Sequence, residues 1–336
     1  MIEEFSGKFI KIKNFCQDNN LIQNSDLVII GLSGGIDSVF LFYFLLWLQQ
    51  RKFVDFDFIA AHLNHQIRKE ADQDQAFVEQ LCQKYSIPLI SKNVDIPGLA
   101  KQRKSGEEEA GRYARQQFFS ELIADYRSKP DYLDSKIKVA LGHHQDDLAE
   151  SVVLNIGRGT GLSGLSTLKA SENFYIRPLL DTSKAQIMNL AQMQAWEWVE
   201  DQTNTSEQYL RNRIRHQLLP LWNEIVGYNI NPLIARLANN LNQDELALIW
   251  AGEEAYKSCL LDKNQLSLGK LRRLPQSIFK FVIDQWLQTR NQTKILSFAQ
   301  TEQLWKIVQG EHGNKLLDLG EGIIVKRYRQ RLIFVE

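Results

Sequence analysis

A glycine- and serine-rich segment near residue 35, the glycine loop, has the composition of an anion-binding loop. It follows an apolar run directly, opens a predicted helix and reads Ser33-Gly34-Gly35-Ile36-Asp37-Ser38. The first turn of a helix carries N–H groups without partners and the positive end of the helix dipole. Two glycines let the backbone approach a phosphate, and two serines add hydroxyl donors. The Walker ending and the G-x-G-x-x-G pattern are both missing, and the alternative is a glycine turn with an Asp or Ser helix cap.

A second segment combines imidazoles and carboxylates where a predicted strand turns into a helix. It reads Gly142-His143-His144-Gln145-Asp146-Asp147-Leu148-Ala149-Glu150. His143 lies on the turn, and Asp147 and Glu150 are three residues apart on the new helix, so both can face one pocket. Paired carboxylates beside a nucleotide can bind Mg²⁺, recognise an amine or act as a base.

Two further segments offer ligand contacts. Residues 62–68 end a predicted strand, at the sheet edge where open α/β sheets bind ligands. The three-residue spacing of His62 and His65 in extended chain disfavours a shared metal, so nucleotide or substrate contacts are expected there. Residues 109–115 place a glutamate and two arginines along one side of a helix. They form either an ion-pair ladder or a site in which Arg112 binds a phosphate or carboxylate through its bidentate fork.

These segments lie among predicted strands that alternate with helices. Strands are predicted at 27–32, 56–63, 88–94 and 138–141, and helices at 38–50, 70–85, 107–127 and from about 146. Such alternation indicates crossover connections. The expected fold is therefore α/β, with a parallel twisted sheet and helices on both faces.

The pattern changes after Pro220. Apolar residues recur at helical spacing over 221–260 and 270–290, and short strands with glycine turns are predicted at 315–319, 322–326 and 331–335. We therefore expect two domains. Residues 1–216 form the catalytic domain, and residues 217–336 form a smaller helical domain that ends in short β-strands.

The composition excludes several classes of protein. The chain has 336 residues, 40 Lys+Arg against 40 Asp+Glu and 44% hydrophobic residues, which excludes disorder and collagen. Its longest apolar run, Val39 to Leu48, is ten residues, too short to span a bilayer. The amino end has no signal-peptide pattern, so a cytoplasmic protein without a membrane partner is expected. Cys16, Cys82 and Cys259 lie far apart, which indicates neither a disulfide framework nor a zinc site.

Zero net charge still permits a nucleic-acid partner, because binding depends on where the charges lie. Basic residues gather just before the predicted domain boundary and in the tail, at Arg211, Arg213, Arg215, Arg272, Arg273, Lys326, Arg327 and Arg329. The alternative for each cluster is a solvated helix face.

The glycine loop, placed after the first strand of an α/β fold, resembles the pyrophosphate-binding loop of the N-type ATP pyrophosphatases, the PP-loop superfamily. Further motifs follow in the order H-x-N-H-x-x-R, E-x-x-R-x-x-R, G-H-H-x-D-D-x-A-E, R-G-x-G-L-x-G-L, R-P-L-L and R-N-R-I-R. Over about residues 25–220 the set is similar to the tRNA(Ile)-lysidine synthases. The tail is similar in kind to the substrate domain of that family.

The resemblance implies a ligase that splits ATP into AMP and pyrophosphate. The implied reaction adenylates the wobble cytidine, position 34, of a tRNA(Ile) with a CAU anticodon and then joins L-lysine to C2 of that base, giving lysidine. The implied ATP-binding residues are the glycine loop and His62. The implied catalytic residues are Asp37, Arg112, His143, Asp147 and Glu150, with Mg²⁺ on Asp37, and the implied tRNA-binding residues are the basic clusters. The general base stays open among His143, Asp147 and Glu150.

Two alternatives differ in their chemistry. A tRNA thiolase on the same scaffold needs cysteines near the nucleotide or an iron–sulfur site, and no cysteine falls in these motifs. A non-catalytic RNA-binding module would gain nothing from Asp37, Asp147 and Glu150, because carboxylates repel a polyanion.

Overall fold

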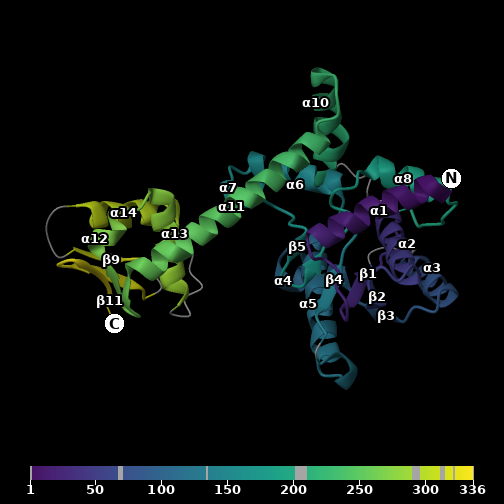
Figure 1. Cartoon of the computed structure of the whole chain (residues 1–336), viewed down its shortest axis with the longest axis horizontal. Coiled ribbons are helices and arrows are strands. Elements are labelled where there is room, and N and C mark those ends of the chain that lie inside the picture. Colours follow the sequence, from purple (N-terminus) through teal and green to yellow (C-terminus); the bar gives the residue numbers. More distant parts are fainter. Residues whose placement is uncertain are drawn as a thin grey trace. The chain divides into compact units, whose positions relative to one another are not determined.

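The computed structural model describes residues 2–66, 71–133, 135–200, 210–289, 296–310, 315–320 and 322–335. The chain forms two compact units, the first unit (Met1–Asn240) and the second unit (Leu241–Glu336), which divide within helix α11 (Asn231–Cys259) (Figure 1). The domain boundary expected after residue 216 stays a prediction.

The first unit alternates strands and helices along the chain. Its helices are α1 (Ile2–Asp18), α2 (Ile36–Gln50), α3 (Ala71–Lys84), α4 (Ile96–Arg103), α5 (Glu107–Arg127), α6 (Gln145–Gly157), α7 (Leu162–Leu165), α8 (Lys184–Met193), α9 (Leu210–Arg213) and α10 (Leu219–Val226), with short turns η1 (Pro130–Tyr132) and η3 (Ile214–Leu218). Its strands are β1 (Leu27–Gly31), β2 (Asp57–Asn64), β3 (Leu89–Asn93), β4 (Ile137–Ala140), β5 (Ser171–Glu172) and β6 (Tyr175–Ile176).

One mixed sheet is the frame of the first unit, with the strand order β3-β2-β1-β4-β6-β5. All neighbouring strands run parallel except β5, which pairs antiparallel with β6. The chain leaves β1 toward β2 and later returns on the other side of β1 as β4. The carboxyl ends of β1 and β4 therefore flank a topological switch point, where open α/β sheets bind ligands.

Successive side chains of β1 enter two different hydrophobic cores. Val28 and Ile30 pack in the core that contains α1, α2 and α8, whereas Leu27 and Ile29 pack in the core that contains α5. All four side chains are fully buried, as in a strand covered on both faces. Figure 1 shows the strands between α2 and α5. The predicted α/β fold with helices on both faces is confirmed.

The turn after β4 lies against the first turn of α2. A Cβ atom added at Gly142 would lie 3.0 Å from the carbonyl carbon of Asp37 and 3.1 Å from the backbone nitrogen of Ser38. A residue without a side chain is needed for the two turns to approach this closely. Gly142 thus joins the two segments that the sequence marks as chemically active.

The second unit packs helices on an antiparallel sheet with the strand order β7-β8-β11-β10-β9. Its core centres on Trp286, which is fully buried and lies 3.9 Å from Phe334, centroid to centroid. Beyond α11, its elements are β7 (Leu260–Asp262), β8 (Gln265–Ser267), α12 (Leu268–Leu271), α13 (Gln276–Gln288), α14 (Phe298–Gln309), β9 (Lys315–Asp318), β10 (Ile324–Tyr328) and β11 (Arg331–Val335). The expected helices and terminal short strands are confirmed.

The differences from the expected elements have local causes. The helix predicted over 221–260 is two helices, because Gly227 takes a left-handed φ of 78° and ends α10. The pattern also missed the helices α1, α4, α7, α8, α9 and α14 and the short strands β5 to β8. Strands of two or three residues are too short to show a hydrophobic period.

The Gly142→Ala variant tests the close approach of the two turns. The added methyl group would push against backbone atoms, so we expect the free energy of unfolding to fall by about 1–3 kcal/mol. Urea denaturation of the purified protein measures it. The matched control is Gly157→Ala at the end of α6, where nothing lies within 4 Å of the added Cβ; it should be neutral or slightly stabilising. Equal stability of the two variants would contradict the packing described here.

Candidate active site

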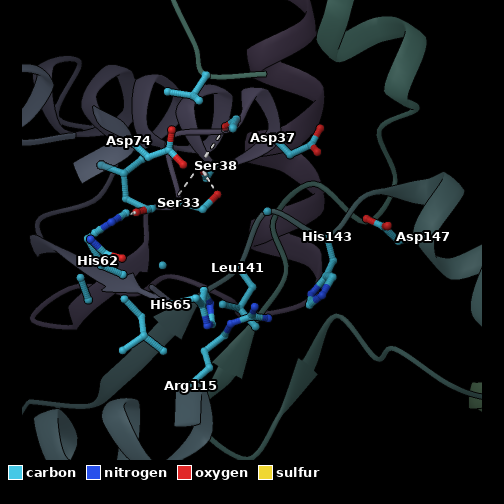
Figure 2. Close-up of a pocket in the computed structure, with 18 of the residues that line it drawn as sticks. Ser33, Asp37, Ser38, His62, His65, Asp74, Arg115, Leu141, His143 and Asp147 are labelled. Carbon is cyan, nitrogen blue, oxygen red and sulfur yellow. Dashed lines mark hydrogen bonds between the residues drawn. The ribbon is translucent and has the colours of Figure 1, made fainter. Parts of the chain in front are cut away.

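A cavity of about 540 Å³ opens at the switch point of the first unit. Its lining includes the glycine loop, the carboxyl end of β2 and the turn after β4. Figure 2 shows Ser33 and Ser38 on one side of it, His62, His65 and Arg115 on another, and His143 and Asp147 on a third. The fold therefore brings together three of the segments that sequence reasoning singled out.

Hydrogen bonds within the glycine loop hold its shape. The Ser38 hydroxyl accepts a bond from the backbone N–H of Ser33 at 3.2 Å and donates one to the carbonyl of Gly35 at 2.8 Å. Gly34 takes a left-handed φ of 89°, and a Cβ there would contact Val199 at 3.4 Å. Gly35 precedes α2 without a side-chain cap, so the first-turn N–H groups of α2 are left for an anion. Ser38 supports this loop from within.

Asp37 is paired with a lysine that sequence reasoning missed. Lys184 Nζ lies 2.7 and 2.8 Å from the two carboxylate oxygens of Asp37. Lys184 is the first residue of α8, whose amino end is closed by a capping box of Ser183 and Gln186. The S-x-x-Q spacing was the available signal, since it marks a helix start and puts Lys184 at its first position.

His62 is fixed by the backbone of the neighbouring strand. Its Nδ1 lies 2.8 Å from the carbonyl oxygen of Leu32. A carbonyl only accepts, so Nδ1 is the donor of this bond, and Nε2 is the ring nitrogen left for a ligand. That buried Nε2 has no hydrogen-bond partner within the described part of the chain, and His62 lines the cavity. Arg68, at the end of the same motif, lies outside the described residues.

The two carboxylates of α6 bind two arginines of the R-N-R-I-R motif. Arg211 Nε lies 2.8 Å from Glu150 and its Nη2 lies 3.0 Å from Asp147. Arg215 Nη2 reaches the same two carboxylates at 2.9 and 3.2 Å. Glu150 is 1% exposed, so removing one partner of this network would leave a buried charge uncompensated. Asp147 lines the cavity together with both arginines.

His143 and Asp147 have opposite electrostatic environments. Burial lowers the pKa of His143 to about 4, helped by Arg177, Arg211 and Arg115 and opposed by Asp147. Burial alone would raise the pKa of Asp147, but the neighbouring His144 and Arg211 hold it at about 2. At neutral pH the imidazole of His143 is therefore uncharged and the carboxylate of Asp147 is ionised.

The helix with two arginines at three-residue steps contributes Arg115 to the cavity lining. Both arginine side chains are exposed, but Arg112 stands outside the described lining, and its catalytic role stays a prediction. Arg112 and Arg115 lie within the same helix α5, and a sequence cannot tell which of two neighbouring turns faces the sheet edge.

The basic residues of the tail divide into two kinds within the second unit. Arg272 donates to the carbonyls of Val308 and Gly310, and Arg327 donates to those of Ile307 and Gly310. These are the last carbonyls of α14, which lack partners inside the helix. By contrast, the side chains of Arg273 and Arg329 are exposed, and Lys326 is partly exposed beside the ring of Tyr328. In the first unit, Arg213 is also exposed.

All three cysteines are buried and lie away from the cavity lining. Cys16 is in α1, Cys82 in α3 and Cys259 in α11, each at most 3% exposed. Burial raises the pKa of each thiol, in Cys82 to about 11.

Over the described ranges, no helix has both the length and the hydropathy needed to cross a bilayer.

Known proteins resemble the chain over both units. Residues 7–222 match the PP-loop domain, and residues 266–333 match the TilS substrate binding domain. The chain is 35% identical over 280 residues to the tRNA(Ile)-lysidine synthase of Petrotoga mobilis, covering 83% of each protein. It is 34% identical over 262 residues to that of Clostridium tetani, covering 77% of this chain and 54% of the relative, so it spans about half the length of that relative.

A solved structure shares the fold over most of the chain. The U34-tRNA thiolase NcsA from Methanococcus maripaludis, with its [4Fe-4S] cluster, aligns with a TM-score of 0.58 at 19% identity. The alignment covers 71% of this chain and 79% of the thiolase. At this identity the likeness shows a common fold.

The pH dependence of stability tests the environment of His143. Its pKa is about 4 in the folded protein and about 6.5 when unfolded, so the unfolded state binds a proton first as the pH falls. Stability should therefore drop between about pH 6.5 and 4, and less so in His143→Gln. Melting temperatures across this range measure the effect, with His216→Gln as the exposed control. If His143→Gln follows the wild-type curve, His143 is not held neutral by the fold.

Proposed function

Because the chain belongs to the tRNA(Ile)-lysidine synthase family, we propose that it joins lysine to the wobble cytidine of a tRNA(Ile) at the expense of ATP. The proposed target is C2 of cytidine 34 in an AUA-specific tRNA with a CAU anticodon, and the product is lysidine. The observation that carries the proposal is one cavity lined by both an uncapped helix amino end and an ionised carboxylate, Asp147. The first suits a triphosphate and the second an ammonium group.

The proposed chemistry has two steps, because oxygen at C2 of cytosine is a poor leaving group. In the first, the O2 oxygen attacks the α-phosphorus of ATP, and the bond to pyrophosphate breaks. In the second, the lysine amine attacks C2 and expels the oxygen as AMP. The products are lysidine, AMP and pyrophosphate. Pyrophosphate departs into the glycine loop, where the N–H groups of α2 compensate its charge.

A magnesium ion fits the proposed site on the chemistry of Asp37. Mg²⁺ in phosphoryl-transfer sites is held by one or two carboxylates together with substrate phosphates, and Asp37 supplies one carboxylate beside the glycine loop. The ion would neutralise charge on the pyrophosphate when bound. In the described part of the chain no three His, Cys, Asp or Glu side chains form a metal cluster, so the phosphates would have to complete its coordination.

The lysine substrate is proposed to meet Asp147. Both carboxylates are bound by the arginines, but Glu150 is 1% exposed and stands outside the described lining, whereas Asp147 lines the cavity. Glu150 therefore orients the arginines, and Asp147 is the carboxylate that a ligand reaches. The amine of free lysine has a pKa of about 10.4 and enters as the ammonium. Its proton must be removed before attack. Of the base candidates His143 and Asp147, which both line the cavity, His143 has the higher pKa, about 4 against about 2, and is proposed as the base.

The second unit is proposed to bind the tRNA body. Another tRNA with the same anticodon presents the same loop, so discrimination needs contacts distant from cytidine 34. The exposed basic residues of the tail are suited to phosphates, which orient a tRNA without reading its sequence. Splaying out a base costs little in an anticodon loop.

The two alternative functions fit the cavity less well. A cysteine-dependent thiolase would need thiolates near the nucleotide, whereas Cys16, Cys82 and Cys259 are buried with raised pKa values and do not line the cavity. A passive RNA-binding module would have no use for the carboxylates Asp37 and Asp147 beside a polyanion.

The direct test is AMP release with purified protein, α-labelled ATP, lysine and tRNA transcripts. AMP should form only when lysine and a CAU-anticodon tRNA(Ile) are both present. Asp147→Asn should raise the KM for lysine at least tenfold, through loss of a charged hydrogen bond, and change the KM for ATP much less. Asp125→Asn, on the surface of α5, is the control. AMP release that ignores lysine would refute the proposal.

Variants of two neighbouring arginines test which basic residues of the tail stabilise the fold and which bind RNA. Arg273→Gln, at an exposed side chain, should weaken tRNA binding and lower the salt dependence of log Kd by about one unit, with stability unchanged. Arg272→Gln removes the bonds to the end of α14 and should destabilise the protein by about 1–3 kcal/mol. Filter binding at several salt concentrations and thermal unfolding measure these effects. The reverse pattern would show that Arg272 binds RNA.

A further inference from the structure

Lys184 stands beside the glycine loop with a side chain that can exchange partners. Its ammonium bridges the two oxygens of Asp37 at 2.7 and 2.8 Å, and both residues line the cavity. The lysine is 38% exposed and the aspartate 31%. An ion pair this open to water contributes little to stability, so an incoming anion can replace the carboxylate at little cost.

The backbone of Lys184 is held firmly, in contrast to its side chain. Its N–H donates to Asp146 at 2.7 Å, and Asp146 in turn accepts a bond from Asn231 at 2.7 Å. The capping box of Ser183 fixes the first turn of α8 from the other side. The flexible side chain of Lys184 therefore starts from a fixed backbone position. Its ammonium can change partners while it stays beside the cavity.

The other cations of the cavity are less available to a phosphate. Arg211 and Arg215 are tied to Asp147 and to Glu150, which is 1% exposed. Withdrawing an arginine would leave a buried carboxylate without compensation, which is strongly unfavourable. Arg115 lies at a distance from Asp37 in Figure 2, on the side of His65. Within the described lining, Lys184 is thus the cation that combines proximity to the glycine loop with a weak existing partner.

We propose that Lys184 is a phosphate-binding residue, whose ammonium leaves Asp37 for the polyphosphate of a nucleoside triphosphate and then holds the departing pyrophosphate. This rests on the proposed function insofar as the glycine loop is taken to bind phosphate. The exchange also frees the carboxylate of Asp37. A lysine in the resting site thereby neutralises a carboxylate that would otherwise repel the approaching anion.

The rival explanation is that Lys184 acts only by neutralising Asp37. Both explanations predict weaker phosphate binding when Lys184 is lost, but they differ once Asp37 carries no charge. With Asn at position 37 there is nothing to neutralise. A direct contact from Lys184 would still strengthen binding in that background, whereas a neutralising role would have no effect.

The experiment is calorimetric titration of inorganic pyrophosphate into the full chain, without tRNA, lysine or a divalent metal. Lys184→Gln should weaken binding at least tenfold. The loss should be as large when both proteins compared carry Asp37→Asn, and Lys184→Arg should recover most of the affinity. The matched control is Lys92→Gln, which removes the exposed pair with Glu121 on the surface and should change nothing.

Three results would overturn the inference: no pyrophosphate binding by the wild type, unchanged binding by Lys184→Gln, or no effect of Lys184→Gln in the Asp37→Asn background. Circular dichroism confirms that each variant is folded, and Lys184→Met replaces Lys184→Gln if the latter is not. Because neither tRNA nor lysine is present, the outcome is separable from the proposed function. A chain that binds pyrophosphate through Lys184 but makes no lysidine would contradict only the latter.

Discussion

The close approach of two strand-to-helix turns is the constraint on which the candidate site depends. Gly142 lets the turn after β4 lie against the backbone of Asp37 and Ser38. With a side chain at this position, the turn after β4 and the first turn of α2 would have to move apart. With the glycine, a helix end suited to anions and a helix end that carries carboxylates share one cavity. The parallel pairing of β1 with β4 places the two turns at the same edge of the sheet. The absence of a side chain at Gly142 then allows their backbones to come into contact.

Ion pairs between carboxylates and basic side chains are the second feature that organises the cavity. Asp37, Asp147 and Glu150 each have a cationic partner, but the partners differ in how firmly they are held. The pair between Asp37 and Lys184 is open to water, whereas Glu150 is enclosed by two guanidinium groups. Desolvation sets the cost of separating an ion pair. The exposed pair of Asp37 and Lys184 can therefore separate easily, whereas the pairs of Glu150 with its two arginines stay intact. That difference suits a site in which phosphates arrive and leave while the carboxylate side keeps its geometry.

Sequence reasoning succeeded where chemistry is local in the chain and was incomplete where it depends on distant partners. The glycine loop, the strands and helices that flank it and the α6 carboxylates follow from short patterns, because turns, caps and helix spacing are set by neighbouring residues. Lys184 was missed because its partner lies 147 residues away. For Arg211 and Arg215 the predicted role in RNA binding stays a prediction, and sequence reasoning missed their contacts with the α6 carboxylates more than 60 residues away. In the tail, Arg272 and Arg273 look alike in sequence, and only the position of α14 separates a helix cap from an exposed charge.

The burial of all three thiols has a practical consequence for following the molecule in solution. Cys16 and Cys82 lie in the core of the first unit, and Cys259 lies in that of the second. A buried thiol with a raised pKa reacts with a disulfide reagent only when its surroundings open. The rate of labelling at Cys259, compared with the rates at the other two, therefore reports whether the units unfold together or one before the other. No probe needs to be engineered into the chain for this purpose.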